Sequence, residues 1–75
     1  MDIADILIHV QPTLNAEQRA KIEEALGASK GVVSAHFSPA HSHELTVAYD
    51  PADAHAGQLL QIVRAWDQAA TMVGL

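Results

Sequence analysis

The five histidines are the side chains of this 75-residue chain best suited to chemistry. Imidazole is the commonest metal ligand in proteins, and the chain has no cysteine to compete for that role. His41 and His43 lie two residues apart and Glu44 follows directly, so two imidazoles and a carboxylate share one short segment. A site of neutral imidazoles with one carboxylate suits zinc, nickel, copper(II) or cobalt.

The absence of cysteine excludes several kinds of bond, catalytic group and metal site. It excludes disulfides, thiolate catalysis and every zinc, copper(I) or iron–sulfur site that depends on cysteine. Ser34, Ser38 and Ser42 lie near histidines in the sequence, but no nucleophile elbow, phosphate loop or dinucleotide-binding fingerprint surrounds them. We therefore expect a protein that is not an enzyme.

Turn and breaker residues divide the chain into six short segments. Pro12, Pro39 and Pro51 each come shortly after an apolar run of strand length. Proline has no N–H to give to a sheet, so each of them is expected to end the strand before it. Two other segments repeat their apolar residues at helical spacing. We predict strands at residues 6–10, 32–38, 44–49 and 71–75, a first helix that follows Asn15 and ends between Gly27 and Gly31, and a second helix at about residues 56–66.

The start of the first helix has a clear signal. Asn15 and Gln18 have the spacing of a capping box, in which each side chain accepts a hydrogen bond from the other residue's backbone. The start of the second helix is ambiguous, because Asp53 is the better cap by residue type while His55 lies nearer the first apolar turn.

The order strand, helix, strand, strand, helix, strand predicts the fold. Right-handed crossovers give an α+β, ferredoxin-like βαββαβ domain covering residues 1–75. Its four-stranded antiparallel sheet has the order 4-1-3-2, with both helices on one face and the other face open. In the hairpin of strands two and three, pairing Ala35 with Val47 and Phe37 with Leu45 matches the buried faces and places His36 opposite Thr46.

Four segments then resemble the heavy-metal-associated domain, the small module of copper chaperones and metal-transporting ATPases. They are 22–26 (IEEAL), 31–32 (GV), 47–51 (VAYDP) and 59–63 (LLQIV), in the family's order and spacing. The VAYDP stretch is the most specific of them, and the resemblance covers nearly the whole chain. It implies a metal-binding or metal-handling protein whose partner is a metal-transporting ATPase or another metal-handling protein.

The chain departs from this family at the metal loop. The family binds metal through Met-x-Cys-x-x-Cys after the first strand, and those positions fall on Thr13, Asn15 and Gln18. The family's Gly-Tyr after the second helix falls on Asp67-Gln68. Soft thiolates select copper(I), so an amide pair is a poor substitute. Docking in the family uses this end of the domain, where Thr13, Asn15, Gln18 and Asp67 would lie.

Four of the five histidines are predicted at that same end. His9 lies near the end of the first strand, His36 lies near the end of the second, and His41 and His43 flank the hairpin tip, whereas His55 lies at the opposite end. Alternation places His9 and His36 on the open face with strand three between them. We predict His36, His41 and His43 as metal ligands, with His9 next and Glu44 as an additional oxygen donor.

The net charge of the chain indicates which kinds of partner it does not bind. Four basic against nine acidic residues give a net charge of −5, which argues against nucleic acid and against a membrane surface. No apolar run reaches the roughly 20 residues of a membrane span, and the first residues are acidic where a secretory signal is basic, so we expect a cytoplasmic protein. The alternative to a metal-binding role is a metal-free homodimeric or adaptor module that uses the open sheet face.

Overall fold

The computed structural model describes residues 2–73 and contains six elements in the predicted order. Both helices begin after a residue in extended conformation, Asn15 for the first and His55 for the second, so His55 and not Asp53 caps the second helix. The elements are β1 (Ala4–His9), α1 (Ala16–Gly27), β2 (Val32–Phe37), β3 (Glu44–Tyr49), α2 (Ala56–Arg64) and β4 (Thr71–Val73).

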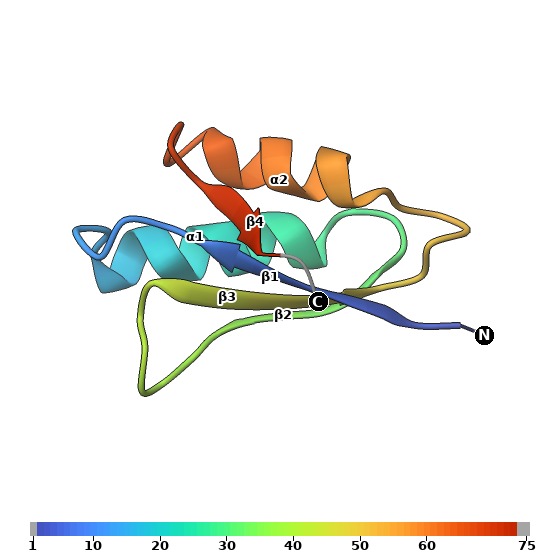
Figure 1. The fold of residues 1–75 in the computed structure, drawn as a ribbon, viewed down its shortest axis with the longest axis horizontal. Helices are drawn as coiled ribbons and strands as arrows, with labels where there is room; N and C mark the ends of the chain where they lie inside the picture. The colour runs from blue at the N-terminus through green and yellow to red at the C-terminus, as the bar shows by residue number, and fades with distance from the viewer. Residues whose placement is uncertain (1, 74–75) are drawn as a thin grey trace.

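The strands form one antiparallel sheet in the order β2-β3-β1-β4, which is the predicted 4-1-3-2 order read from the other edge. Both helices lie against the same face of this sheet, and the other face is left without a covering layer (Figure 1). The predicted ferredoxin-like α+β fold is therefore confirmed.

The pairing of β2 with β3 also has the predicted register. Ala35 pairs with Val47 and Phe37 with Leu45, and His36 lies opposite Thr46. Burial explains this register, because Leu45 and Val47 are fully buried under the helices. A slip of one residue would turn both side chains to the uncovered face.

Several boundaries differ from the predicted ones by a few residues. β1 begins at Ala4 and ends at His9, and Val10 is buried just beyond it. α2 ends at Arg64, and Trp66 lies in the following turn, where its N–H donates to the carbonyl of Val63. β4 ends at Val73, and the part of the predicted strand at residues 74–75 lies outside the described residues.

The core lies between the helices and the sheet. α1 and α2 each turn an apolar stripe toward the strands, as their helical spacing predicts. Removing this apolar surface from water is the main contribution to the stability of so small a domain. The largest fully buried side chains are Ile8, Ile22, Leu26, Leu45, Val47, Leu59 and Val63.

Candidate metal site

The uncovered face of the sheet carries the residues that alternate with the core. Residues directly opposite one another in an antiparallel sheet point to the same face, so the register assigns this face. One row across the sheet contains Thr71, His9 and Glu44, and the next contains Val73, Leu7, Thr46 and His36. Three of the predicted site residues, His9, Glu44 and His36, therefore share a face, and the first two are direct neighbours.

His9 is the last residue of β1 and pairs with Glu44, the first residue of β3. The neighbouring Ile8 is fully buried, so alternation directs the His9 side chain away from the helices. Its Nε2 lies 3.9 Å from Oε1 of Glu44. The end of β1 thus brings an imidazole and a carboxylate together.

The hairpin between β2 and β3 brings His43 to the same place. The carbonyl of His43 accepts a hydrogen bond of 2.9 Å from the N–H of Val10, which ties the hairpin to the end of β1. The hairpin itself is closed by the N–H of Ser38 donating to the carbonyl of Glu44 (2.9 Å) and by the N–H of Glu44 donating to the carbonyl of His41 (2.9 Å). His43 is therefore positioned by backbone hydrogen bonds on both of its sides.

Three imidazoles and one carboxylate gather at this corner of the sheet, which we call the histidine corner (His9, His41, His43 and Glu44). The rings of His9 and His43 are 5.7 Å apart between centroids, and those of His41 and His43 are 5.9 Å apart. Nε2 of His43 lies 3.9 Å from the same Glu44 oxygen that His9 approaches. The side chains of His9, His43 and Glu44 are 42%, 41% and 30% exposed, so solvent and a metal ion reach them.

His36 and His55 lie apart from the histidine corner. His36 is exposed on β2, separated from β1 by β3, and neither ring contact among the imidazoles includes it. His55 caps the start of α2, and this end of α2 lies at the other end of the domain from the hairpin between β2 and β3 (Figure 1). The structure thus groups His9, rather than His36, with the hairpin pair His41 and His43.

The donors of the histidine corner come near to metal-binding geometry without reaching it. Two ligand atoms on one tetrahedral zinc ion lie roughly 3.4 Å apart, given metal–ligand distances of about 2.1 Å, and the two Nε2–Oε1 distances are 3.9 Å. Within residues 2–73, no three His, Asp or Glu side chains stand ready to hold an ion. Exposed side chains change rotamer within picoseconds to nanoseconds, and the side chains of His9, His43 and Glu44 are all partly exposed. The nitrogen and oxygen donors fit a divalent ion, whereas copper(I) prefers soft thiolates that the chain lacks.

The loop after β1, where the resemblance places the family's metal motif, is occupied by structural hydrogen bonds. The predicted capping box is confirmed: Asn15 Oδ1 accepts from the N–H of Gln18 (2.8 Å), and Gln18 Oε1 accepts from the N–H of Asn15 (2.9 Å). The Arg19 guanidinium donates to the carbonyl of Leu14, whose side chain is buried. The amide oxygens of Asn15 and Gln18, at the positions that the resemblance aligns with the family's cysteines, therefore stabilise the start of α1.

Asp67 has a role that the sequence did not predict. It lies at the expected end of the domain, but it is only 8% exposed and does not form a docking surface. Its carboxylate accepts from the N–H of Gln11 (2.8 Å) and from the N–H of Ala69 (3.0 Å). One side chain thus joins the loop after β1 to the turn before β4. The bond to Ala69 has the local spacing of an Asx turn, which a sequence can indicate. The bond to Gln11 joins residues 56 apart, so no local pattern indicates it.

Asp67→Ala is expected to lower the free energy of unfolding by about 2 kcal/mol, because it leaves a part-buried N–H without an acceptor. The measurement is urea unfolding followed by circular dichroism. Asp53→Ala is the matched control, since the Asp53 carboxylate is exposed and pairs with Lys30 at 3.7 Å. We expect a change of at most about 0.5 kcal/mol for the control. Equal effects of the two substitutions would contradict the assigned role of Asp67.

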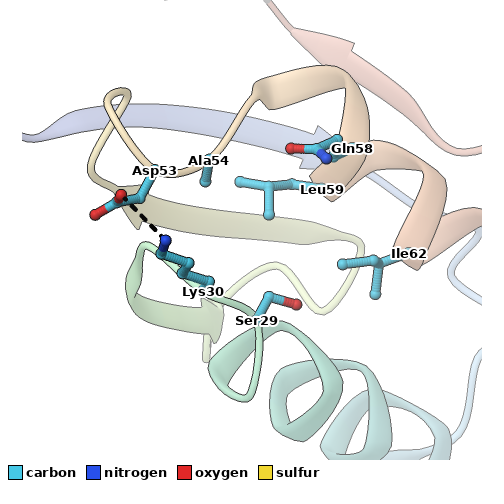
Figure 2. A pocket seen from close by; sticks show the side chains of 7 residues that line it. All are labelled: Ser29, Lys30, Asp53, Ala54, Gln58, Leu59 and Ile62. Carbon is cyan, nitrogen blue, oxygen red and sulfur yellow. Dashed lines mark ion pairs between the residues drawn. The ribbon is translucent and has the colours of Figure 1, made fainter.

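A hollow of about 380 Å³ lies at the other end of the domain, between the end of α1 and the start of α2 (Figure 2). The Lys30–Asp53 ion pair crosses one side of it, and apolar side chains form its floor. It contains no imidazole and lies away from the histidine corner. Its lining residues are Ser29, Lys30, Asp53, Ala54, Gln58, Leu59 and Ile62.

Comparison with known proteins establishes the fold. No family model matches the sequence, and no curated protein matches it. A solved CopZ metallochaperone is similar over 93% of this chain and 100% of its own, with 20% identity and a TM-score of 0.75. A copper-binding domain from HMA7, a P-type ATPase, aligns over 93% of both chains with 18% identity and a TM-score of 0.77. Oxidized MerP from Ralstonia metallidurans CH34 aligns over 96% of both chains with 11% identity and a TM-score of 0.75.

The chain therefore has the ferredoxin-like fold of heavy-metal-associated domains and lacks the cysteines of their metal motif. At these identities, the similarity concerns the arrangement of the backbone and leaves function to the side chains. Neither helix within residues 2–73 has the length and apolar character needed to traverse a lipid bilayer.

Proposed function

We propose that this protein binds a divalent transition-metal ion through the histidine corner and acts as a metal-handling protein. The observation that carries the proposal is that Nε2 of His9 and Nε2 of His43 both lie 3.9 Å from one Glu44 oxygen. His9 is the last residue of β1, Glu44 is the first residue of β3, and His43 lies in the turn just before it. The hydrogen bond from the N–H of Val10 to the carbonyl of His43 holds the turn against the end of β1. His41, in ring contact with His43, is a further donor.

The donor set favours zinc, nickel, copper(II) or cobalt as the cargo. Imidazole nitrogen with one carboxylate oxygen suits these borderline ions, whereas copper(I) and mercury prefer sulfur. The fold neighbours include a metallochaperone and a copper-binding domain of a P-type ATPase. The role that they suggest for this chain is the binding and transfer of an ion, with no reaction catalysed on it.

The partner that we propose is a metal-transporting ATPase or another metal-handling protein, in the cytoplasm. Transfer of an ion needs a site that the acceptor's ligands reach directly. The histidine corner meets this condition, because the side chains of His9 and His43 are about two-fifths exposed. They lie at the end of the domain that also contains the loop after β1 (Figure 1). Thr13 and Asn15 are exposed in that loop and are available for docking.

Calorimetric titration of the purified, tag-free chain with zinc, nickel, cobalt and copper(II) tests the function. We expect about one ion per chain, and an affinity at least about tenfold weaker at about pH 5.5 than at about pH 7.5, because protons compete with the metal for imidazole nitrogen. His55→Ala is the control, since it removes an imidazole from the opposite end and is expected to leave the affinity unchanged. Heats that do not exceed those of buffer for every ion would refute the metal-binding function.

A metal-free interaction module is the second candidate, and exposed apolar side chains favour it. Val33, Met72 and Val73 are 59%, 42% and 37% exposed along the strands at the two edges of the sheet. A homodimer through the uncovered face would cover part of this surface. Sedimentation of the metal-free chain distinguishes the candidates, because the module alone predicts a dimer in the absence of any ion.

A further inference from the structure

The histidine corner offers too few donors for a complete site in one chain. Zinc sites in proteins are almost always four-coordinate, and within residues 2–73 no three candidate side chains are already arranged around a common point. His9, His43 and Glu44 converge from one side only, and alternation directs His9 and Glu44 away from the helices. The remaining coordination positions of a bound ion therefore face outward from the uncovered sheet face.

The same face carries an imidazole that the histidine corner does not use. His36 lies opposite Thr46, in the row next to His9 and Glu44, and its side chain is exposed. β3 separates its strand from β1. Two strand spacings amount to about 10 Å, too far for His36 and His9 of one chain to hold one ion easily.

Resting on the metal-binding function proposed above, we propose that a second copy of the chain completes the site. His36 of each protomer supplies a ligand to the ion held by His9, His43 and Glu44 of the other. In a two-fold dimer each contact occurs twice, so one symmetric arrangement uses both His36 residues and forms two equivalent sites. Sheets packed face to face lie about 10 Å apart. In the proposed dimer, the imidazoles of both protomers and the bound ions occupy this space.

Charge makes this association depend on the metal. Each chain carries a net charge of −5, and Glu44 and Asp5 both lie on the uncovered face. Two metal-free chains brought together through this face would set these carboxylates against one another. Two divalent cations between the faces offset that repulsion, so the ion acts as the link between protomers.

Sedimentation velocity of the full chain, with zinc chloride as the probe, tests the arrangement. We expect monomers in chelator, dimers containing one zinc per chain after zinc is added, and the same behaviour for the His55→Ala control. His36→Ala is expected to remain monomeric and still bind zinc, with a dimer dissociation constant at least about tenfold higher than that of the wild type.

Mixing two variants provides the decisive measurement. His36→Ala keeps the histidine corner, and His43→Ala keeps His36, so neither variant alone forms a complete site. A heterodimer of the two contains one intact site. Zinc is therefore expected to produce dimers in the mixture and not in either variant alone, and circular dichroism verifies that both variants are folded.

The outcomes separate the two proposals. Zinc binding by a wild-type chain that stays monomeric would overturn the shared site and leave the metal-binding function standing. Zinc-dependent dimers of His36→Ala that are as tight as those of the wild type, or dimers of the wild type in chelator, would also overturn the shared site. Absence of zinc binding would overturn the shared zinc site, and absence of binding by zinc, nickel, cobalt and copper(II) alike would refute the metal-binding function as well. Dimers in the mixture alone would support the exchange of His36 between protomers.

Discussion

Gly31→Ala is expected to lower the free energy of unfolding by about 3 kcal/mol, the largest effect we anticipate for a single added methyl group. Gly31 has a φ of +87°, a region that side chains other than glycine rarely adopt. A Cβ at this position would lie 2.9 Å from Cβ of Asp53 and 3.0 Å from Cβ of Ala54. Backbone strain of about 1–2 kcal/mol and overpacking of about 1–3 kcal/mol add to this estimate.

The neighbours of Gly31 have little freedom to move aside. Ala54 is buried, and the N–H of Asp50 donates to the carbonyl of Gly31 over 2.7 Å. The turn between α1 and β2 is therefore packed directly against the loop between β3 and α2. A domain of this size has a total stability of about 4–11 kcal/mol, so a loss of about 3 kcal/mol is a large part of it.

Gly27→Ala is the matched control, because a Cβ there meets nothing within 4 Å and the residue lies in α1. Alanine is favoured over glycine in a helix by up to about 1 kcal/mol, so the control is expected to be neutral or stabilising. Chemical unfolding followed by circular dichroism measures both variants. Similar stability changes for the two would show that the packing at Gly31 does not have the assigned effect.

The fold and the register followed from the sequence because local signals agreed with one another. Proline and glycine separated the elements, and alternation in Glu44–Tyr49 fixed which side chains are buried. The pairing of Ala35 with Val47 then followed from matching the two buried faces. Ends of elements were less accurate, since Trp66 continued the helical spacing but lies beyond α2.

The details of the histidine corner depend on contacts between distant parts of the chain. Parity correctly placed His9 and His36 on the uncovered face, but the approach of His43 to His9 depends on the hydrogen bond from the N–H of Val10 to the carbonyl of His43. The part-buried hydrogen bond from the N–H of Gln11 to the Asp67 carboxylate is also a contact between distant parts of the chain. Contacts between residues far apart in the chain produce no periodic pattern in the sequence. The sequence therefore predicted the candidate histidines, but not which of them lie together.

This grouping gives His43→Ala the largest expected effect on metal binding. His43 is the central residue of the histidine corner, because its ring contacts both His9 and His41 and its Nε2 approaches Glu44. Its removal takes away one donor and separates the two remaining imidazoles. We expect the zinc affinity of dilute protein to fall about 100-fold, equivalent to about 2.7 kcal/mol.

His36→Ala is the informative comparison when the protein is dilute. At low concentration no dimer forms, so only the donors within one chain determine the zinc affinity. His36→Ala is expected to change the monomer's zinc affinity by less than about threefold, which is under 1 kcal/mol, since its ring contacts none of the other imidazoles. A competition titration against a zinc-binding dye measures both variants. If His36→Ala lowers the affinity as much as His43→Ala does, His36 of the same chain is a ligand, and the ion lies between β2 and the hairpin rather than between His9 and His43. If neither lowers it, zinc binds elsewhere on the chain, and the convergence on Glu44 has no part in holding the ion.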